Sequence, residues 1–201
     1  MVVSRDALRA MLVQGSILRT RTSKFRPAPS IFTYPGLSST KPFWTESFYS
    51  NHTDIVHILE SNYDVILKEY HGLKCIHKKD NTLTSNHSDY KDDHHKLHSG
   101  QWDWHSYILK GERQSSFASN CPKTVKVLES LNQPKLMTGN PFSFAFFSTM
   151  GSGAEIQPHY GPSNLRIRCH YPLIIPDGDL GMECGGEKIT WNPGKPIFFD
   201  D

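Results

Sequence analysis

Residues 53–70 carry the first strong periodic pattern of the chain. Their apolar residues recur at intervals of three and four, which places them on one face of a helix. Thr53 and Asp54 supply side-chain oxygens of the kind that begin helices, and Gly72 is a residue type at which helices end. We therefore predict one helix over residues 53–70, followed by a polar loop over residues 74–100.

Beyond this loop, the pattern changes to the alternation of apolar and polar residues that indicates strands. Residues 101–110 alternate with a period of two. Pro122 occupies the first position of a short predicted helix, residues 122–129, with Ser119 or Asn120 as its N-cap. Helices followed by strands and Gly/Pro turns indicate an α+β chain that ends in a sandwich or barrel. Four further strands are predicted: residues 142–149, 165–175, 188–191 and 196–199.

Charge is uneven along the 201 residues, whose formal net charge is +2. Residues 1–29 contain six basic residues and one acidic residue, so the rest of the chain is slightly acidic. We interpret residues 1–30 as a basic, disordered leader, or alternatively a transit peptide, and residues 31–201 as one domain. A net charge this close to zero does not point to a nucleic-acid partner. No stretch approaches the roughly 18 consecutive apolar residues that a membrane span needs. Four scattered cysteines leave the redox compartment open.

The clearest candidate chemistry lies in the strand that ends at Tyr171. An arginine fork suits carboxylates, so a cationic strand face is able to clamp a small dianion; a face exposed to solvent is the alternative interpretation. His159, at a strand-to-turn junction just before, is a candidate metal ligand beside that anion site. Alternation sorts the strand into an apolar face and a cationic face: Leu165, Ile167, Cys169 and Tyr171 against Arg166, Arg168 and His170.

The same region carries a long motif, Pro158-His159-Tyr160-Gly161-Pro162-Ser163-Asn164-Leu165-Arg166-Ile167-Arg168-Cys169-His170. With Phe147-Ser148-Thr149-Met150, Thr190-Trp191 and Phe199-Asp200-Asp201, it closely resembles the aspartyl/asparaginyl β-hydroxylase family. Weaker similarity extends upstream to about residue 31. The resemblance implies a double-stranded β-helix, or jelly roll, with N-terminal helices packed on it. It also implies a dioxygenase that uses Fe(II), 2-oxoglutarate and O2 to hydroxylate the β-carbon of Asp or Asn.

The resemblance also implies roles for individual residues. His159 matches the first iron-binding histidine. Gly161 stands where most related oxygenases have a carboxylate ligand, which agrees with a two-histidine iron site. Arg166 could lie exposed at the rim of the pocket. Five residues match positions around the 2-oxoglutarate pocket: Trp102, Ser148, Met150, Arg168 and His170.

The second iron-binding histidine of the family, and an arginine that pairs with the distal carboxylate of 2-oxoglutarate, lie beyond the position of Asp201. We therefore expect a fragment that lacks the last strands of the jelly roll and shows weak or no turnover alone. A non-catalytic jelly-roll module that binds without reacting is the alternative. The resemblance implies protein substrates with Asp or Asn, EGF-like domains in animal members, and an endoplasmic reticulum location; a soluble intracellular location is the other reading.

Three further signals compete with this interpretation. His94 and His98 would share a helical face near His87, but a solvated loop explains such a hydrophilic stretch better. Trp102, Trp104 and Tyr107 could stack on single-stranded nucleic acid, although aromatic residues on a strand are more often core. The sequence Gly151-Ser152-Gly153 is a turn rather than a phosphate loop.

Overall fold

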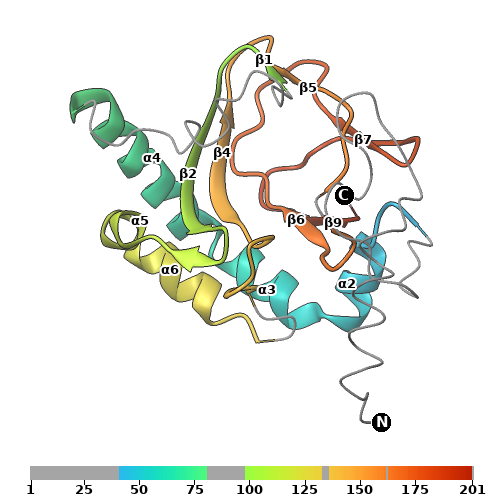
Figure 1. The fold of residues 1–201 in the computed structure, drawn as a ribbon, viewed down its shortest axis with the longest axis horizontal. Helices are drawn as coiled ribbons and strands as arrows, with labels where there is room; N and C mark the ends of the chain where they lie inside the picture. The colour runs from blue at the N-terminus through green and yellow to red at the C-terminus, as the bar shows by residue number, and fades with distance from the viewer. Residues whose placement is uncertain (1–40, 81–97, 133–135, 162, 201) are drawn as a thin grey trace.

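The computed structural model describes residues 41–80, 98–132, 136–161 and 163–200, so the predicted leader and the start of the domain near residue 31 lie outside the described residues (Figure 1). Its helices are α2 (Thr45–Asn51), α3 (Thr53–Ser61), α4 (Tyr63–Asp80), α5 (Ser115–Asn120) and α6 (Pro122–Glu129). Its strands are β1 (His98–Ser99), β2 (Trp102–Leu109), β3 (Glu112–Arg113), β4 (Ala145–Met150), β5 (Glu155–Ile156), β6 (Arg168–His170), β7 (Met182–Cys184), β8 (Glu187–Ile189) and β9 (Ile197–Phe199).

The strands form small antiparallel sheets. The largest has the order β3-β2-β4, and the others are the pairs β1–β5, β6–β9 and β7–β8. Phe43 extends the β6–β9 pair by a bridge to Phe199. The described residues therefore form a mixed α/β structure with helices beside its sheets (Figure 1). The jelly roll stays a prediction.

The region predicted as one helix is two. Asn62 separates α3 from α4, and its side-chain amide donates to the carbonyl of Ile58 at 2.8 Å, which competes with continued helical pairing. Gly72 does not end the helix, because α4 continues through it to Asp80. Burial of Leu73, which is only 1% exposed, outweighs the cost of about 1 kcal/mol for a glycine inside a helix.

Two other predictions around this region were wrong in detail. The residue before α3 is His52, and it makes no side-chain cap, so the predicted cap at Thr53 and Asp54 does not form. Residues 74–80 are helical rather than a loop, because they continue the packed helix α4. Residues 81–97, which include most of the histidine-rich stretch, lie outside the described residues, and His98 lies in β1 with its ring 5.3 Å from that of Trp102.

The predicted strand over residues 101–110 is confirmed as β2, and the helix over residues 122–129 as α6. The predicted caps of α6 were wrong, because Ser119 and Asn120 lie inside α5, a helix that the sequence pattern did not show. A carboxylate from α4 takes their place. Glu69 accepts hydrogen bonds from the backbone N–H groups of Lys123 (3.0 Å) and Thr124 (2.7 Å), which are donors that a helix cannot satisfy internally.

The later strands are shorter than predicted. Only Arg168–His170 of the predicted strand 165–175 pairs, and its partner is β9. β4 covers the second half of the predicted strand 142–149 and extends to Met150. The turn at Gly151-Ser152-Gly153 is confirmed.

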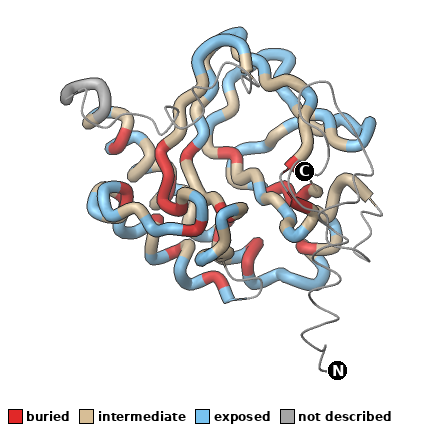
Figure 2. Tube along the Cα trace, in the orientation of Figure 1, coloured by how far each residue is buried: buried red, intermediate tan, exposed pale blue. Residues whose placement is uncertain are grey.

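Buried residues form two clusters, and Figure 2 marks the buried positions in red along the chain trace. The β2–β4 core lies between helices α4–α6 and that sheet, and it includes Leu73, Ile108, Phe117, Cys121 and Phe147. The β9 core joins α2 and α3 to β9. It is centred on Phe198, whose ring stacks on Phe48 at 3.9 Å between centroids. Among the described helices, none is long and apolar enough to cross a membrane.

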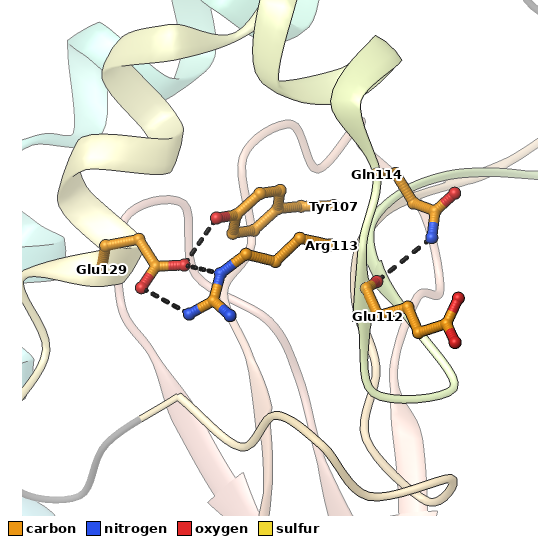
Figure 3. A network of polar contacts seen from close by, with 5 residues as sticks. All are labelled: Tyr107, Glu112, Arg113, Gln114 and Glu129. Carbon is orange, nitrogen blue, oxygen red and sulfur yellow. Dashed lines mark hydrogen bonds and ion pairs between the residues drawn. The ribbon is translucent and has the colours of Figure 1, made fainter.

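A polar network completes the β2–β4 core at its edge (Figure 3). The hydroxyl of Tyr107 donates to Glu129 at 2.5 Å, and Arg113 donates to both oxygens of the same carboxylate at 2.7 and 2.9 Å. Hydrogen bonds from Arg113 and then Tyr107 lower the pKa of Glu129 to about 2. The network therefore holds the β2–β3 turn against α6.

Candidate functional site

Three of the five predicted co-substrate residues lie together on the β2–β4 sheet. Trp102 pairs in register with Met150, and Trp104 with Ser148. Opposite residues of an antiparallel pair project to the same face, so these four side chains share one face. The indole N–H of Trp102 donates to the hydroxyl oxygen of Ser148 at 2.8 Å. Because Ser148 is the acceptor in this contact, its own hydroxyl proton remains available to donate elsewhere.

Aromatic rings continue this face along the sheet. The rings of Trp102 and Trp104 meet edge to face at 4.7 Å, and Trp104 stacks on Phe146 at 4.6 Å. The opposite face is turned to α4, where Tyr70 makes a 3.0 Å hydroxyl contact with Thr149 and Lys74 pairs with Asp103. The helices therefore cover one face of β2–β4, and the predicted site residues lie on the other.

The other two predicted co-substrate residues, Arg168 and His170, lie on β6 and are half-buried. The imidazole of His170 contacts the ring of Phe199 edge to face at 4.7 Å and that of Trp191 at 6.2 Å. Trp191 and Phe199 therefore flank the predicted site. Both residues belong to the segments that resemble the family, but the sequence analysis assigned neither of them a role.

The cationic residues of this segment are less exposed than two of its apolar residues. Leu165 is 37% exposed and Ile167 39% exposed, whereas Arg166, Arg168 and His170 are half-buried. Partial burial favours a polar cavity over a fully solvated face, and both interpretations stay predictions. Arg166 is half-buried rather than exposed, and its guanidinium donates to the carbonyl of Phe142 at 2.7 Å.

His159 lies in the loop between β5 and β6, half-buried. Its Nδ1 lies 2.7 Å from the carbonyl oxygen of Gln157. A carbonyl can only accept, so Nδ1 carries the proton, and in the neutral ring the lone pair is on Nε2. This is the arrangement that metal-binding histidines adopt when a carbonyl fixes the ring. No sequence signal pointed to this contact, because any residue supplies a carbonyl.

Across the described residues, no three His, Cys, Asp or Glu side chains gather into a group able to hold a metal ion. His159 thus fits one ligand position of a metal site, and the described part of the chain does not supply a complete set of metal ligands around it. The structure joins Trp102, Ser148 and Met150 in one group and places Arg168 and His170 in another. That the two groups surround one shared ligand stays a prediction.

Comparison with known proteins assigns this mixed α/β chain to a family. The family model described as aspartyl/asparaginyl beta-hydroxylase matches residues 60–201. The chain therefore belongs to the aspartyl/asparaginyl β-hydroxylase family, as the motif around His159 indicated. The description of the family and the name of its human member both refer to β-hydroxylation.

Individual relatives agree. The chain is 30% identical over 172 residues to the human aspartyl/asparaginyl beta-hydroxylase, covering 86% of this chain and 21% of the relative. It is 32% identical over 193 residues to aspartate beta-hydroxylase domain-containing protein 2 of Xenopus tropicalis, covering 94% of this chain and 47% of that protein. The chain thus spans from about a fifth to half of the length of these relatives.

Proposed function

We propose that this chain is an Fe(II)- and 2-oxoglutarate-dependent dioxygenase domain that hydroxylates the β-carbon of Asp or Asn in protein substrates. Family membership supports hydroxylation. The observation that carries the finer assignment is the half-burial of Arg168 and His170 on β6 beside the more exposed Leu165 and Ile167. Cations withdrawn from water attract a carboxylate more strongly, because less solvent screens them.

Three of the residues present fit roles that such a reaction needs. The guanidinium of Arg168 offers a planar fork to a carboxylate of 2-oxoglutarate. The hydroxyl of Ser148, which accepts from Trp102, has its proton available for a second acceptor. The imidazole of His159, oriented by Gln157, offers Nε2 to iron. Iron with 2-oxoglutarate and O2 supplies the oxidation of an unreactive C–H bond, which side chains alone do not perform.

Binding of 2-oxoglutarate to the full chain, with Mn²⁺ in place of iron, tests the anion site. We expect Arg168→Ala to weaken binding about tenfold or more, because it removes charged hydrogen bonds. Arg113→Ala is the matched control, since it deletes the same charge at the exposed ion pair with Glu129. Equal affinities for wild type and both variants would show that β6 is not the binding strand.

Metal binding tests His159 separately. We expect His159→Ala to lower the affinity for Mn²⁺ and His57→Ala, an exposed change on α3, to leave it unaltered. Turnover is then measured as succinate released with a peptide that gains one oxygen atom. Tight 2-oxoglutarate binding with no metal-dependent turnover on any Asp or Asn peptide would favour the non-catalytic binding module.

A further inference from the structure

Two tyrosines connect the β6–β9 pair to the helices beneath it. Tyr171 directly follows His170, the last residue of β6, and its hydroxyl donates to the carbonyl of Leu59 in the last turn of α3 at 2.7 Å. Burial, followed by the neighbouring Tyr63 and Glu60, raises the pKa of Tyr171, so the hydroxyl stays protonated and keeps donating. The strand is therefore fastened to α3 one residue beyond the predicted anion site.

Tyr63, the first residue of α4, makes the second connection. Its hydroxyl donates to the carbonyl of Leu173 at 2.7 Å, and its ring meets that of Tyr171 edge to face at 6.4 Å. Tyr63 also packs against the turn that leads into β9. A Cβ placed on Gly194 would lie 3.2 Å from this ring, and the N–H of Gly194 donates to Pro172 at 2.8 Å. Tyr63 thus contacts the exit of β6 and the approach to β9.

These connections matter because β6 itself is short. Its three residues pair with three of β9, and Figure 1 shows the pair lying over α2 and α3. The side chain of Tyr171 reaches α3 through its hydroxyl, whereas the ring of His170 contacts Phe199 and Trp191, so the two adjacent side chains lie in different surroundings. The contact of Tyr171 with α3 therefore restrains the short strand that carries His170.

We propose that the two tyrosines are positioning residues that set the direction in which Arg168 and His170 point. This role rests on the proposed function, because it gives the anion site its purpose. The hydroxyls touch backbone carbonyls of α3 and of the segment after β6, so they act on a ligand only through the strand. Removing either hydroxyl releases one end of the strand without changing any residue of the predicted site.

Tyr107 supplies a matched control. It is a buried tyrosine whose hydroxyl also makes one hydrogen bond to a helix, but that bond goes to Glu129 at the edge of the β2–β4 core. Tyr107→Phe therefore removes the same chemical group with a comparable loss of stability, away from β6. A merely structural role predicts the same behaviour for Tyr171→Phe, Tyr63→Phe and Tyr107→Phe.

The experiment compares these three variants of the full chain by two measurements. Amide hydrogen exchange reports on the order of β6, and titration with 2-oxoglutarate in the presence of Mn²⁺ reports on the anion site. We expect Tyr171→Phe and Tyr63→Phe to speed exchange at residues 168–171 and to weaken binding about three- to tenfold each. Tyr107→Phe lowers the midpoint of thermal unfolding similarly but leaves exchange in β6 and the affinity unchanged.

Each other outcome counts against the positioning role. Unchanged exchange in β6 for Tyr171→Phe and Tyr63→Phe would show that the tyrosines do not hold the strand. Faster exchange with unchanged affinity would show that they stabilise the fold only. If wild type itself does not bind 2-oxoglutarate, the proposed function fails and this role fails with it, whereas exchange still reports whether the strand is held.

Discussion

The β2–β4 and β6–β9 pairs are both antiparallel, but they differ in what packs against them. Helices α4–α6 close one face of β2–β4, where Ile108 is fully buried and the Tyr107 hydroxyl is paired with Glu129. Around β6, the apolar side chains of Leu165 and Ile167 remain exposed while the cations are half-buried. The helix-covered face of β2–β4 is packed for stability, whereas the segment around β6 keeps charged groups partly accessible to a ligand. The two regions should therefore respond differently to the same kind of substitution.

Truncation of an apolar side chain gives the largest expected contrast. Ile108→Ala removes a side chain that is 0% exposed in the β2–β4 core, and we expect a loss of about 2–5 kcal/mol in the free energy of unfolding. Ile167→Ala, the matched change before β6, should cost less than about 0.5 kcal/mol because its side chain is exposed. Urea denaturation measures both. Similar losses would mean that the face near β6 is covered and that the contrast is wrong.

Removal of the carboxylate that caps α6 should have an intermediate effect. Glu69→Ala leaves the N–H groups of Lys123 and Thr124 without this acceptor, and we expect a loss of about 1 kcal/mol in the free energy of unfolding. Glu112→Ala, at an exposed position of β3, is the control and should change little. If both variants unfold at the same denaturant concentration as wild type, the cap contributes nothing measurable.

Acidification should produce the smallest effect, again in the helix-covered region. The pKa of Glu129 is lowered from 4.5 to about 2. The ionised carboxylate therefore contributes its full stabilisation above about pH 5, and this stabilisation is lost as the pH falls toward 2. The effect is modest because the carboxylate is partly exposed. Thermal unfolding of wild type and Glu129→Gln should differ most at neutral pH and converge near pH 2. A difference that does not depend on pH would exclude this carboxylate as its cause.

The helix-covered region was largely predictable from the sequence, and the reasons are local. Period-two alternation indicated β2, and Pro122 indicated the start of α6. The sequence did not reveal α5, because its six residues contain three serines and an asparagine, which favour helices weakly. Burial of Phe117 in the β2–β4 core stabilises that helix. Packing between residues far apart in the chain cannot be predicted from the local sequence pattern.

The sequence motif named candidate site residues, whose assignment stays a prediction, and it carried no information on their geometry. The motif identified His159 and Arg168, yet the contact that orients His159 comes from the backbone of Gln157, which has no sequence signature. The strand around Arg168 was expected to extend over residues 165–175, but only three residues pair with β9. Side-chain contacts with distant helices, such as Tyr171 to Leu59, hold the rest.

The cap that Glu69 provides for α6 also bears on the order of folding. The capping carboxylate lies more than 50 residues before the N–H groups that it accepts from, so α6 gains this stabilisation only after the chain between them has closed into a loop. A helix of eight residues is marginal in isolation. We therefore expect α4 and α6 to form cooperatively.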